Sequence, residues 1–202
     1  NEELPPLPFP DGKFDLVYAF SVFTHISVHW AAWLLELDRV LAPEGRIVAS
    51  FMSEGMCEPV TGEPWDESNI GMNVYEEGQD WSLGGPMVMH SPWWIEEHWG
   101  RLFDVERLVP SGFFDDRSGL GQDDHGAVTL VKRPGEPPPR EELERLDPAE
   151  SREATALLHE VRRLRTENAA LESRPTVTAD GGPTSGREAA RALWAAARRR
   201  LG

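Results

Sequence analysis

Residues 7–51 read LPFPDGKFDLVYAFSVFTHISVHWAAWLLELDRVLAPEGRIVASF and decide the fold. Residues 14–20 form a nearly continuous apolar run after a Pro-Asp-Gly turn, a pattern typical of a strand buried on both faces of a parallel sheet. Apolar residues then recur every three or four positions, which predicts an amphipathic helix starting near residue 28 with Ser27 as its N-cap. Residues 45–51 are a second, β-branched run, so the stretch predicts a βαβ unit.

This stretch resembles the second half of the class I S-adenosylmethionine-dependent methyltransferase domain. The resemblance is carried by LPFPDGKFDLVYAFSVFTHI and by LLELDRVLAPEGRIV, which look like the family's L-P-F-x-D-G-x-F-D-x-V strand and E-L-x-R-V-L-x-P-G-G helix exit. Glu44 stands where the family has the first glycine, so we expect Gly45 to supply the positive φ of this turn. The resemblance covers about residues 4–133.

The resemblance implies an α/β fold with a Rossmann-like methyltransferase sheet that ends in an antiparallel strand pair and is followed by a helical tail. Ser91 and Pro92 open the helix before that pair, and residues 103–109 and 127–131 are its strands. The sequence has no glycine-rich turn after a buried strand and no acidic residue placed to bind a ribose, although both hold the cofactor in the family. We therefore expect a partial domain whose amino-terminal strands are missing and which is inactive alone.

Composition restricts the classes of partner. The chain of 202 residues has 40% hydrophobic and 27% charged residues, which is ordinary for a globular protein, and no apolar run long enough for a membrane span. Its formal net charge of -15 disfavours nucleic acid as a partner and leaves a small-molecule acceptor. The single cysteine, Cys57, excludes an internal disulfide and predicts a cytoplasmic protein.

Five segments follow from the changes in composition. We expect a partial methyltransferase domain at residues 1–133, a proline-rich extended linker at 134–146, a coiled-coil-like helix at 147–174, a disordered linker at 175–186 and a basic helix at 187–202. The basic helix suits a membrane surface, an acidic partner, or simply a soluble helix of a longer protein.

The coiled-coil prediction depends on spacings that alternate between four and three residues. An asparagine at a core position favours a parallel two-stranded state, so a homodimer is expected. The alternative is a single helix that lies on a neighbouring domain. The core positions are Leu157, Val161, Leu164, Asn168 and Leu171.

The cofactor is expected in the loop after the first strand, because ligands of open α/β sheets bind outside the carboxyl ends of the strands. The resemblance implies that Phe20, Ser21 and Val22 contact S-adenosylmethionine. His25 is the titratable group of this loop and is the predicted catalytic base, with capping of the next helix or packing at its start as the alternative. His25 and His29 have metal-ligand spacing, but no third ligand follows, so no metal site is predicted.

The acceptor is expected between this loop and the insert at residues 52–90, where the family places its acceptor pocket. Aromatic walls with scattered acids suit a polar small molecule such as a sugar, although aromatic residues also cover sheets. Residues 122–125 are interpreted as a solvated turn, with a position facing the acceptor as the alternative. The predicted substrate-binding residues are Phe23, Thr24, Trp81 and His90, with Trp65 and Tyr75 as further aromatic walls.

The sequence therefore predicts S-adenosylmethionine-dependent methyl transfer to a small molecule, in particular to a sugar or glycan hydroxyl. The alternative is a non-catalytic scaffold that uses a degenerate methyltransferase half to carry an oligomerising helix. A strand and glycine-rich turn encoded upstream of Asn1 would favour the enzyme, and an in-frame start near Asn1 would favour the scaffold.

Overall fold

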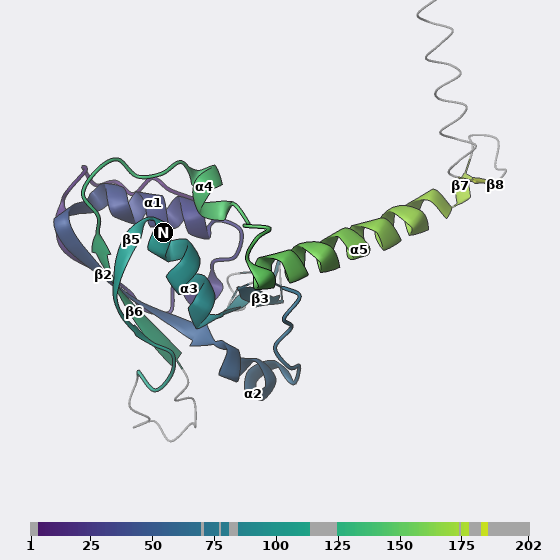
Figure 1. Cartoon of the computed structure of the whole chain (residues 1–202), viewed down its shortest axis with the longest axis horizontal. Coiled ribbons are helices and arrows are strands. Elements are labelled where there is room, and N and C mark those ends of the chain that lie inside the picture. The colour runs from purple at the N-terminus through teal and green to yellow at the C-terminus, as the bar shows by residue number, and fades with distance from the viewer. Residues whose placement is uncertain are drawn as a thin grey trace, which may run out of the picture. The chain divides into compact units, whose positions relative to one another are not determined.

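The computed structural model describes residues 4–69, 71–76, 78–80, 85–113, 125–173, 175–177 and 183–185 (Figure 1). The chain divides into two compact units, Asn1–Asp147 and Pro148–Gly202. The first unit is a mixed α/β domain with helices packed on a sheet. The second unit is built on one long helix.

The first unit runs through its strands and helices in the following order: β1 (Phe14–Ala19), η1 (Phe23–His25), α1 (Trp30–Val40), β2 (Leu41–Ser53), η2 (Glu54–Met56), α2 (Cys57–Thr61), β3 (Met72–Tyr75), β4 (Met87–His90), α3 (Pro92–His98), η4 (Trp99–Arg101), β5 (Phe103–Val109), β6 (His125–Lys132) and α4 (Arg140–Glu144).

The sheet has the strand order β3-β4-β2-β6-β5, and β1 pairs with β2. β1 runs parallel to β2, with Val17 opposite Ile47 and Ala19 opposite Ala49, and β2 continues past β1 to pair in parallel with β4. β6 is antiparallel to both β2 and β5. The predicted α/β class and the antiparallel pair at the end of the sheet are both confirmed.

The start of α1 differs from the prediction. The helix begins at Trp30 with His29 as its N-cap residue, and no side chain caps it, so the assignment of Ser27 as the cap is wrong. The backbone N–H of Trp33 instead bonds to the carbonyl of His29, 3.0 Å away. The backbone alone therefore forms the first turn, and residues 26–29 are used to lead the chain out of η1.

The backbone at Glu44 and Gly45, in the first part of β2, also differs from the prediction. Glu44, not Gly45, has the positive φ, at 61°. Gly45 is needed for another reason: a Cβ there would lie 2.8 Å from the carbonyl oxygen of Ala42 and 3.2 Å from that of Phe14. Hydrogen is the only side chain that fits where the backbone of β1 approaches this turn.

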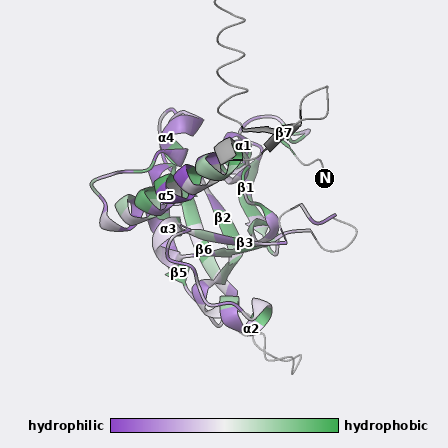
Figure 2. Cartoon of the chain, turned by 90° about the vertical axis from the view of Figure 1, so that its right-hand side faces the viewer, coloured by the Kyte–Doolittle hydropathy of each residue, from purple (hydrophilic) through white to green (hydrophobic). Residues whose placement is uncertain are grey.

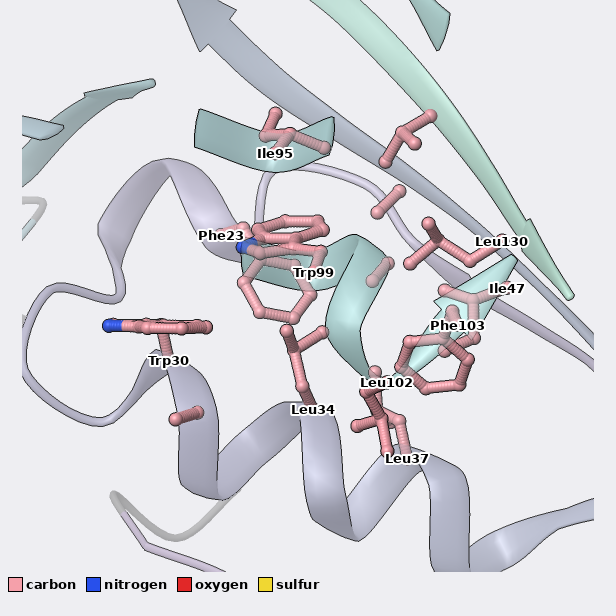
Figure 3. Packing of buried hydrophobic residues seen from close by; sticks show 14 of the residues in the cluster. Phe23, Trp30, Leu34, Leu37, Ile47, Ile95, Trp99, Leu102, Phe103 and Leu130 are labelled. Carbon is pink, nitrogen blue, oxygen red and sulfur yellow. The ribbon is translucent and has the colours of Figure 1, made fainter. Parts of the chain in front are cut away.

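One face of the sheet, α1 and α3 share a single core, in which tryptophan rings fill the space between helix and strand (Figure 3). Figure 2 shows hydrophobic residues along the central strands of the sheet. Ser91 and Pro92 start α3 where the sequence predicts. The apolar residues predicted for α3 and for the turn after it are buried, namely Trp94, Ile95, Trp99 and Leu102. Members of the core are Ala19, Phe23, Trp30, Leu34, Ile47, Phe51, Trp94, Ile95, Trp99, Leu102, Phe103 and Leu130.

The extended linker predicted for residues 134–146 contains a helix, α4, that packs on the first unit. Leu143 is fully buried in the core. Its carbonyl accepts a hydrogen bond from His98 Nδ1 at 2.9 Å and one from Arg101 Nη1 at 3.2 Å. The prolines make only the start of this segment extended, and tertiary contacts hold the rest.

In the second unit, α5 spans Ser151–Ser173, within the range predicted for the coiled-coil-like helix. β7 (Pro175–Val177) and β8 (Pro183–Ser185) pair antiparallel where no regular structure was predicted. The predicted basic helix lies outside the described residues. Across the described ranges, no helix has both the length and the hydropathy that a membrane span requires.

Candidate functional site

The candidate site lies at the carboxyl end of β1, where β1 runs beside β2. Both strands run in the same direction, so the loop at residues 20–26 leaves the sheet next to Ser50 of β2. The backbone N–H of Ser21 donates to Ser50 Oγ at 2.9 Å. A hydroxyl in the middle of an apolar strand therefore anchors the first turn of the loop, and Ser50 itself is fully buried.

Ser21 has a strained backbone. Its φ of 53° lies in the left-handed region, which residues other than glycine seldom adopt. Such a conformation costs about 1 kcal/mol or more and persists only where surrounding contacts impose it, as they often do at ligand sites. Here the bond to Ser50 Oγ and the approach of Ser21 Oγ to Thr24 Oγ1, 3.4 Å, fix the turn.

The three predicted cofactor residues lie together on an exposed surface. Phe20 is 42% exposed and Val22 is 41% exposed, and Ser21 between them is also exposed. The Phe20 ring contacts Phe113 with 6.0 Å between ring centroids. The structure thus presents two apolar side chains and one hydroxyl on the open side of the loop.

Two of the predicted substrate residues are core residues instead. Phe23 is 1% exposed and packs against Trp99, with 4.6 Å between ring centroids (Figure 3). Thr24 is also 1% exposed. In this conformation both side chains are buried beneath η1. Their predicted contact with the acceptor stays a prediction.

His25 is held against the strand that follows the insert. Its Nδ1 lies 2.8 Å from the carbonyl oxygen of Pro86. A carbonyl can only accept, so Nδ1 carries the hydrogen in this bond, and Nε2 has the lone pair when the ring is neutral. The alternative that His25 caps α1 is not what the structure shows, since the N-cap residue is His29.

His90 is fully buried and lies 5.8 Å from Trp99 between ring centroids. Neither ring nitrogen has a hydrogen-bond partner among the residues that the structure describes. Burial lowers the pKa of His90 to about 3, so the ring is neutral at ordinary pH. The structure therefore separates His90 from the open side of the loop, and the predicted acceptor contact stays a prediction. Trp81, the fourth predicted substrate residue, lies outside the described residues.

A cavity of about 430 Å³ lies over β3 and the turn before it. Two of the aromatic residues predicted as acceptor walls, Trp65 and Tyr75, do line it. Sequence reasoning missed the polar residues beside them, and the run Asp66-Glu-Ser-Asn, typical of a side-chain-bonded turn, was the available signal. The lining residues are Glu63, Pro64, Trp65, Asp66, Asn69, Asn73, Val74 and Tyr75.

In the described ranges, no three His, Cys, Asp or Glu side chains are placed to bind one metal ion.

Cys57 is buried, forms no disulfide and lies next to Tyr75, and burial raises the pKa of its thiol. Of the predicted solvated turn, only His125 is described, and it begins β6.

Comparison with known proteins agrees with this architecture. The family profile described as "Methyltransferase domain" matches residues 2–49, which form β1, η1, α1 and most of β2. The resemblance predicted from the sequence is therefore confirmed for this segment. No curated protein matches the chain.

Among solved structures, a SAM-dependent methyltransferase from Methanosarcina mazei is 16% identical with a TM-score of 0.41, covering 63% of this chain and 63% of that one. The 1,6-didemethyltoxoflavin-N1-methyltransferase of Burkholderia thailandensis, solved with 1,6-didemethyltoxoflavin and S-adenosylhomocysteine, is 15% identical with a TM-score of 0.41, covering 64% of this chain and 47% of that one. The chain spans less than two thirds of the length of either protein.

Proposed function

We propose that this chain belongs to an enzyme that transfers a methyl group from S-adenosylmethionine to a small-molecule acceptor, in particular to a sugar or glycan hydroxyl. The observation that carries the proposal is the methyltransferase-domain match over residues 2–49. That segment supplies β1, the strained loop after it and the strand that anchors the loop. Ligand sites of open α/β sheets lie at this position.

The exposed loop fits the proposed cofactor. Phe20 and Val22 offer apolar surface to an adenosyl or methionine group, and the exposed Ser21 between them offers a hydroxyl. The bound cofactor would supply an activated methyl group. The protein then has to align the acceptor and exclude water, and it needs a base only for a poor nucleophile.

His25 is the proposed base for such a nucleophile. The carbonyl of Pro86 holds its Nδ1–H, so the lone pair of the neutral ring is on Nε2, and this nitrogen is the proposed acceptor of the hydroxyl proton. A sugar hydroxyl is a weak nucleophile, so removing its proton during attack favours the reaction. Replacing His25 with Gln keeps a hydrogen-bonding side chain without a basic nitrogen, and we expect the rate of methyl transfer to fall by about 10²-fold or more.

The 202-residue chain by itself is proposed to be inactive, since its sequence has no glycine-rich turn following a buried strand. The cytoplasm is the proposed location, and no nucleic-acid partner is proposed because the net charge of -15 repels phosphate backbones.

The loop conformation provides the test. In the protein expressed from its complete native reading frame, Ser21→Gly retains the left-handed turn, whereas Ser21→Val opposes it with a β-branched side chain. Calorimetric titration with S-adenosylmethionine should give near-native affinity for Ser21→Gly and at least about tenfold weaker binding for Ser21→Val. Equal affinities for the two variants, or no binding by the parent protein, would contradict the proposed cofactor site.

We also propose that α5 forms a homodimer. Val161, Leu164 and Leu171 are 42%, 44% and 60% exposed, which leaves a stripe of apolar side chains for a partner helix. Replacing Leu164 with Asp should abolish association, while Asn168→Leu should strengthen it and loosen its stoichiometry. Sedimentation equilibrium on the 202-residue chain measures both. If the parent and both variants sediment as monomers, α5 is not a dimerisation helix.

A further inference from the structure

The insert that carries the cavity has an unusual charge pattern. Between Arg46 and Arg101 the sequence contains no lysine or arginine. A segment with acids alone produces a negative local potential that attracts cations. The acids between β2 and β4 are Glu54, Glu58, Glu63, Asp66, Glu67, Glu76, Glu77 and Asp80.

The cavity concentrates this pattern. Its lining includes Glu63 and Asp66 together with Trp65 and Tyr75, and no described lining residue is basic. Glu63 forms no ion pair in the described part of the chain. Acidic and aromatic residues around one space are the kind that bind a protonated amine, through charge and through cation–π attraction.

The polar wall of the cavity is already organised. Asp66 Oδ1 accepts from the Ser68 backbone N–H at 2.9 Å, and Asp66 Oδ2 accepts from Asn69 Nδ2 at 3.1 Å. Asn73, only 3% exposed, accepts from the Asp66 backbone N–H at 3.2 Å and donates to its carbonyl at 3.3 Å. Little conformational entropy remains to be lost when a ligand enters.

The cavity also has a defined relation to the proposed base. Tyr75, which lines the cavity, pairs across the sheet with Met87 of β4. The next residue back, Pro86, holds His25. Tyr75 and His25 therefore both adjoin the start of β4, from two different segments of the chain. A group bound in the cavity is thus held by residues other than the proposed base.

We propose that this cavity binds a protonated amine on the acceptor, so that the acceptor is an amino sugar whose ammonium group is recognised away from the methylated hydroxyl. The acceptor role rests on the proposed function, whereas the cation preference rests on the cavity alone. Glu63 and Asp66 attract the ammonium group, and Trp65 and Tyr75 pack against the sugar ring. Binding energy from this remote group positions the reacting hydroxyl.

The test compares glucosamine with glucose, in the absence of S-adenosylmethionine, by ligand-observed NMR titration of the protein expressed from its complete native reading frame. Glucosamine should bind about tenfold more tightly than glucose, and the preference should weaken as salt is added. Glu63→Gln should reduce the preference at least about threefold. Glu67→Gln, a neighbouring exposed acid outside the cavity lining, is the matched control and should leave the preference unchanged.

Equal binding of the two sugars, no binding of either, or the same preference in the Glu63 and Glu67 variants would overturn the cavity proposal. Methyl transfer is measured separately. An amine preference without methyl transfer supports the cavity proposal and removes the proposed function. Methyl transfer without an amine preference retains the function and overturns the cavity proposal.

Discussion

The two faces of β1 have very different surroundings. Ala19 points into the core shared with α1 and α3 and is 6% exposed, whereas Leu16 and Tyr18 point the other way and are 58% and 72% exposed. The sequence of this strand is apolar on both faces, as expected of a strand covered on both sides. The described residues cover only one side, which indicates that the other face of β1 is adapted to a further layer of structure.

Truncating a buried side chain on the core side of the sheet should have the largest effect on stability. Phe51, on the core side of β2, is fully buried, so Phe51→Ala in the 202-residue chain should lower the free energy of unfolding by about 3–5 kcal/mol. Tyr18→Ala, on the exposed side of β1, should change it by less than about 0.5 kcal/mol. Urea unfolding of both variants is the measurement. Similar losses in the two variants would show that both faces are covered in solution.

The pH dependence of stability tests how completely the core side is buried. The pKa of His90 is about 3 in the folded protein against an ordinary value of 6.5, so the unfolded chain takes up a proton first as the pH falls. The contribution of His90 should therefore decrease below about pH 6.5 and amount to a loss of about 3 kcal/mol by pH 4.

Replacing His90 with Phe should remove this part of the pH dependence, as seen in urea midpoints at pH 7 and pH 4. His159→Gln, on the exposed surface of α5, is the control and should leave the dependence unchanged. An unaltered pH profile in the His90 variant would mean that the ring is protonated or hydrated in the folded state.

Substitutions at two neighbouring positions in the first part of β2 should show smaller effects of opposite sign. Glu44→Gly relieves a left-handed conformation and should stabilise the chain by about 0.5–1 kcal/mol. Gly45→Ala places a methyl group against the carbonyl of Ala42 and should destabilise it by about 1 kcal/mol or more. Thermal melting of the pair measures this, and stabilisation by Gly45→Ala would contradict the geometry.

The exposed face of β1 should also be detectable without unfolding. The 202-residue chain should bind a hydrophobic dye, and Leu16→Lys with Tyr18→Lys should reduce the dye fluorescence, because the charges interrupt the apolar surface. Leu158→Lys, at an exposed leucine of α5 that is 58% accessible, is the control. Unchanged fluorescence in the double variant would place the dye elsewhere.

The βαβ unit could be predicted because each of its parts has a periodic signal, and the antiparallel pair because its strands alternate. The helix α4 could not, since a buried Leu143 and hydrogen bonds from His98 and Arg101, distant in sequence, form its site on the core. The prediction that Gly45 has a positive φ was wrong for a similar reason. Glycine is required at this position because two backbone segments approach closely there, and the sequence does not show this approach.

The candidate site was predictable in position but not in orientation. The loop at residues 20–26 follows from the strand before it, yet the residue types alone do not show that Phe23 and Thr24 point inward while Phe20 and Val22 point outward. His90 is similar, since a histidine at the end of a strand has the same sequence signature whether buried or exposed. The polar wall of the cavity depends on β3 folding back beside β4.

The proposal tested last is that the loop at residues 20–26 forms part of an S-adenosylmethionine site and that the 202-residue chain does not bind this cofactor alone. Calorimetric titration of S-adenosylmethionine into two proteins tests it most directly: the 202-residue chain, and the protein expressed from its complete native reading frame. We expect micromolar binding by the protein expressed from the complete reading frame and no measurable binding by the 202-residue chain. Micromolar binding by the 202-residue chain alone, or no binding by either protein, would contradict it.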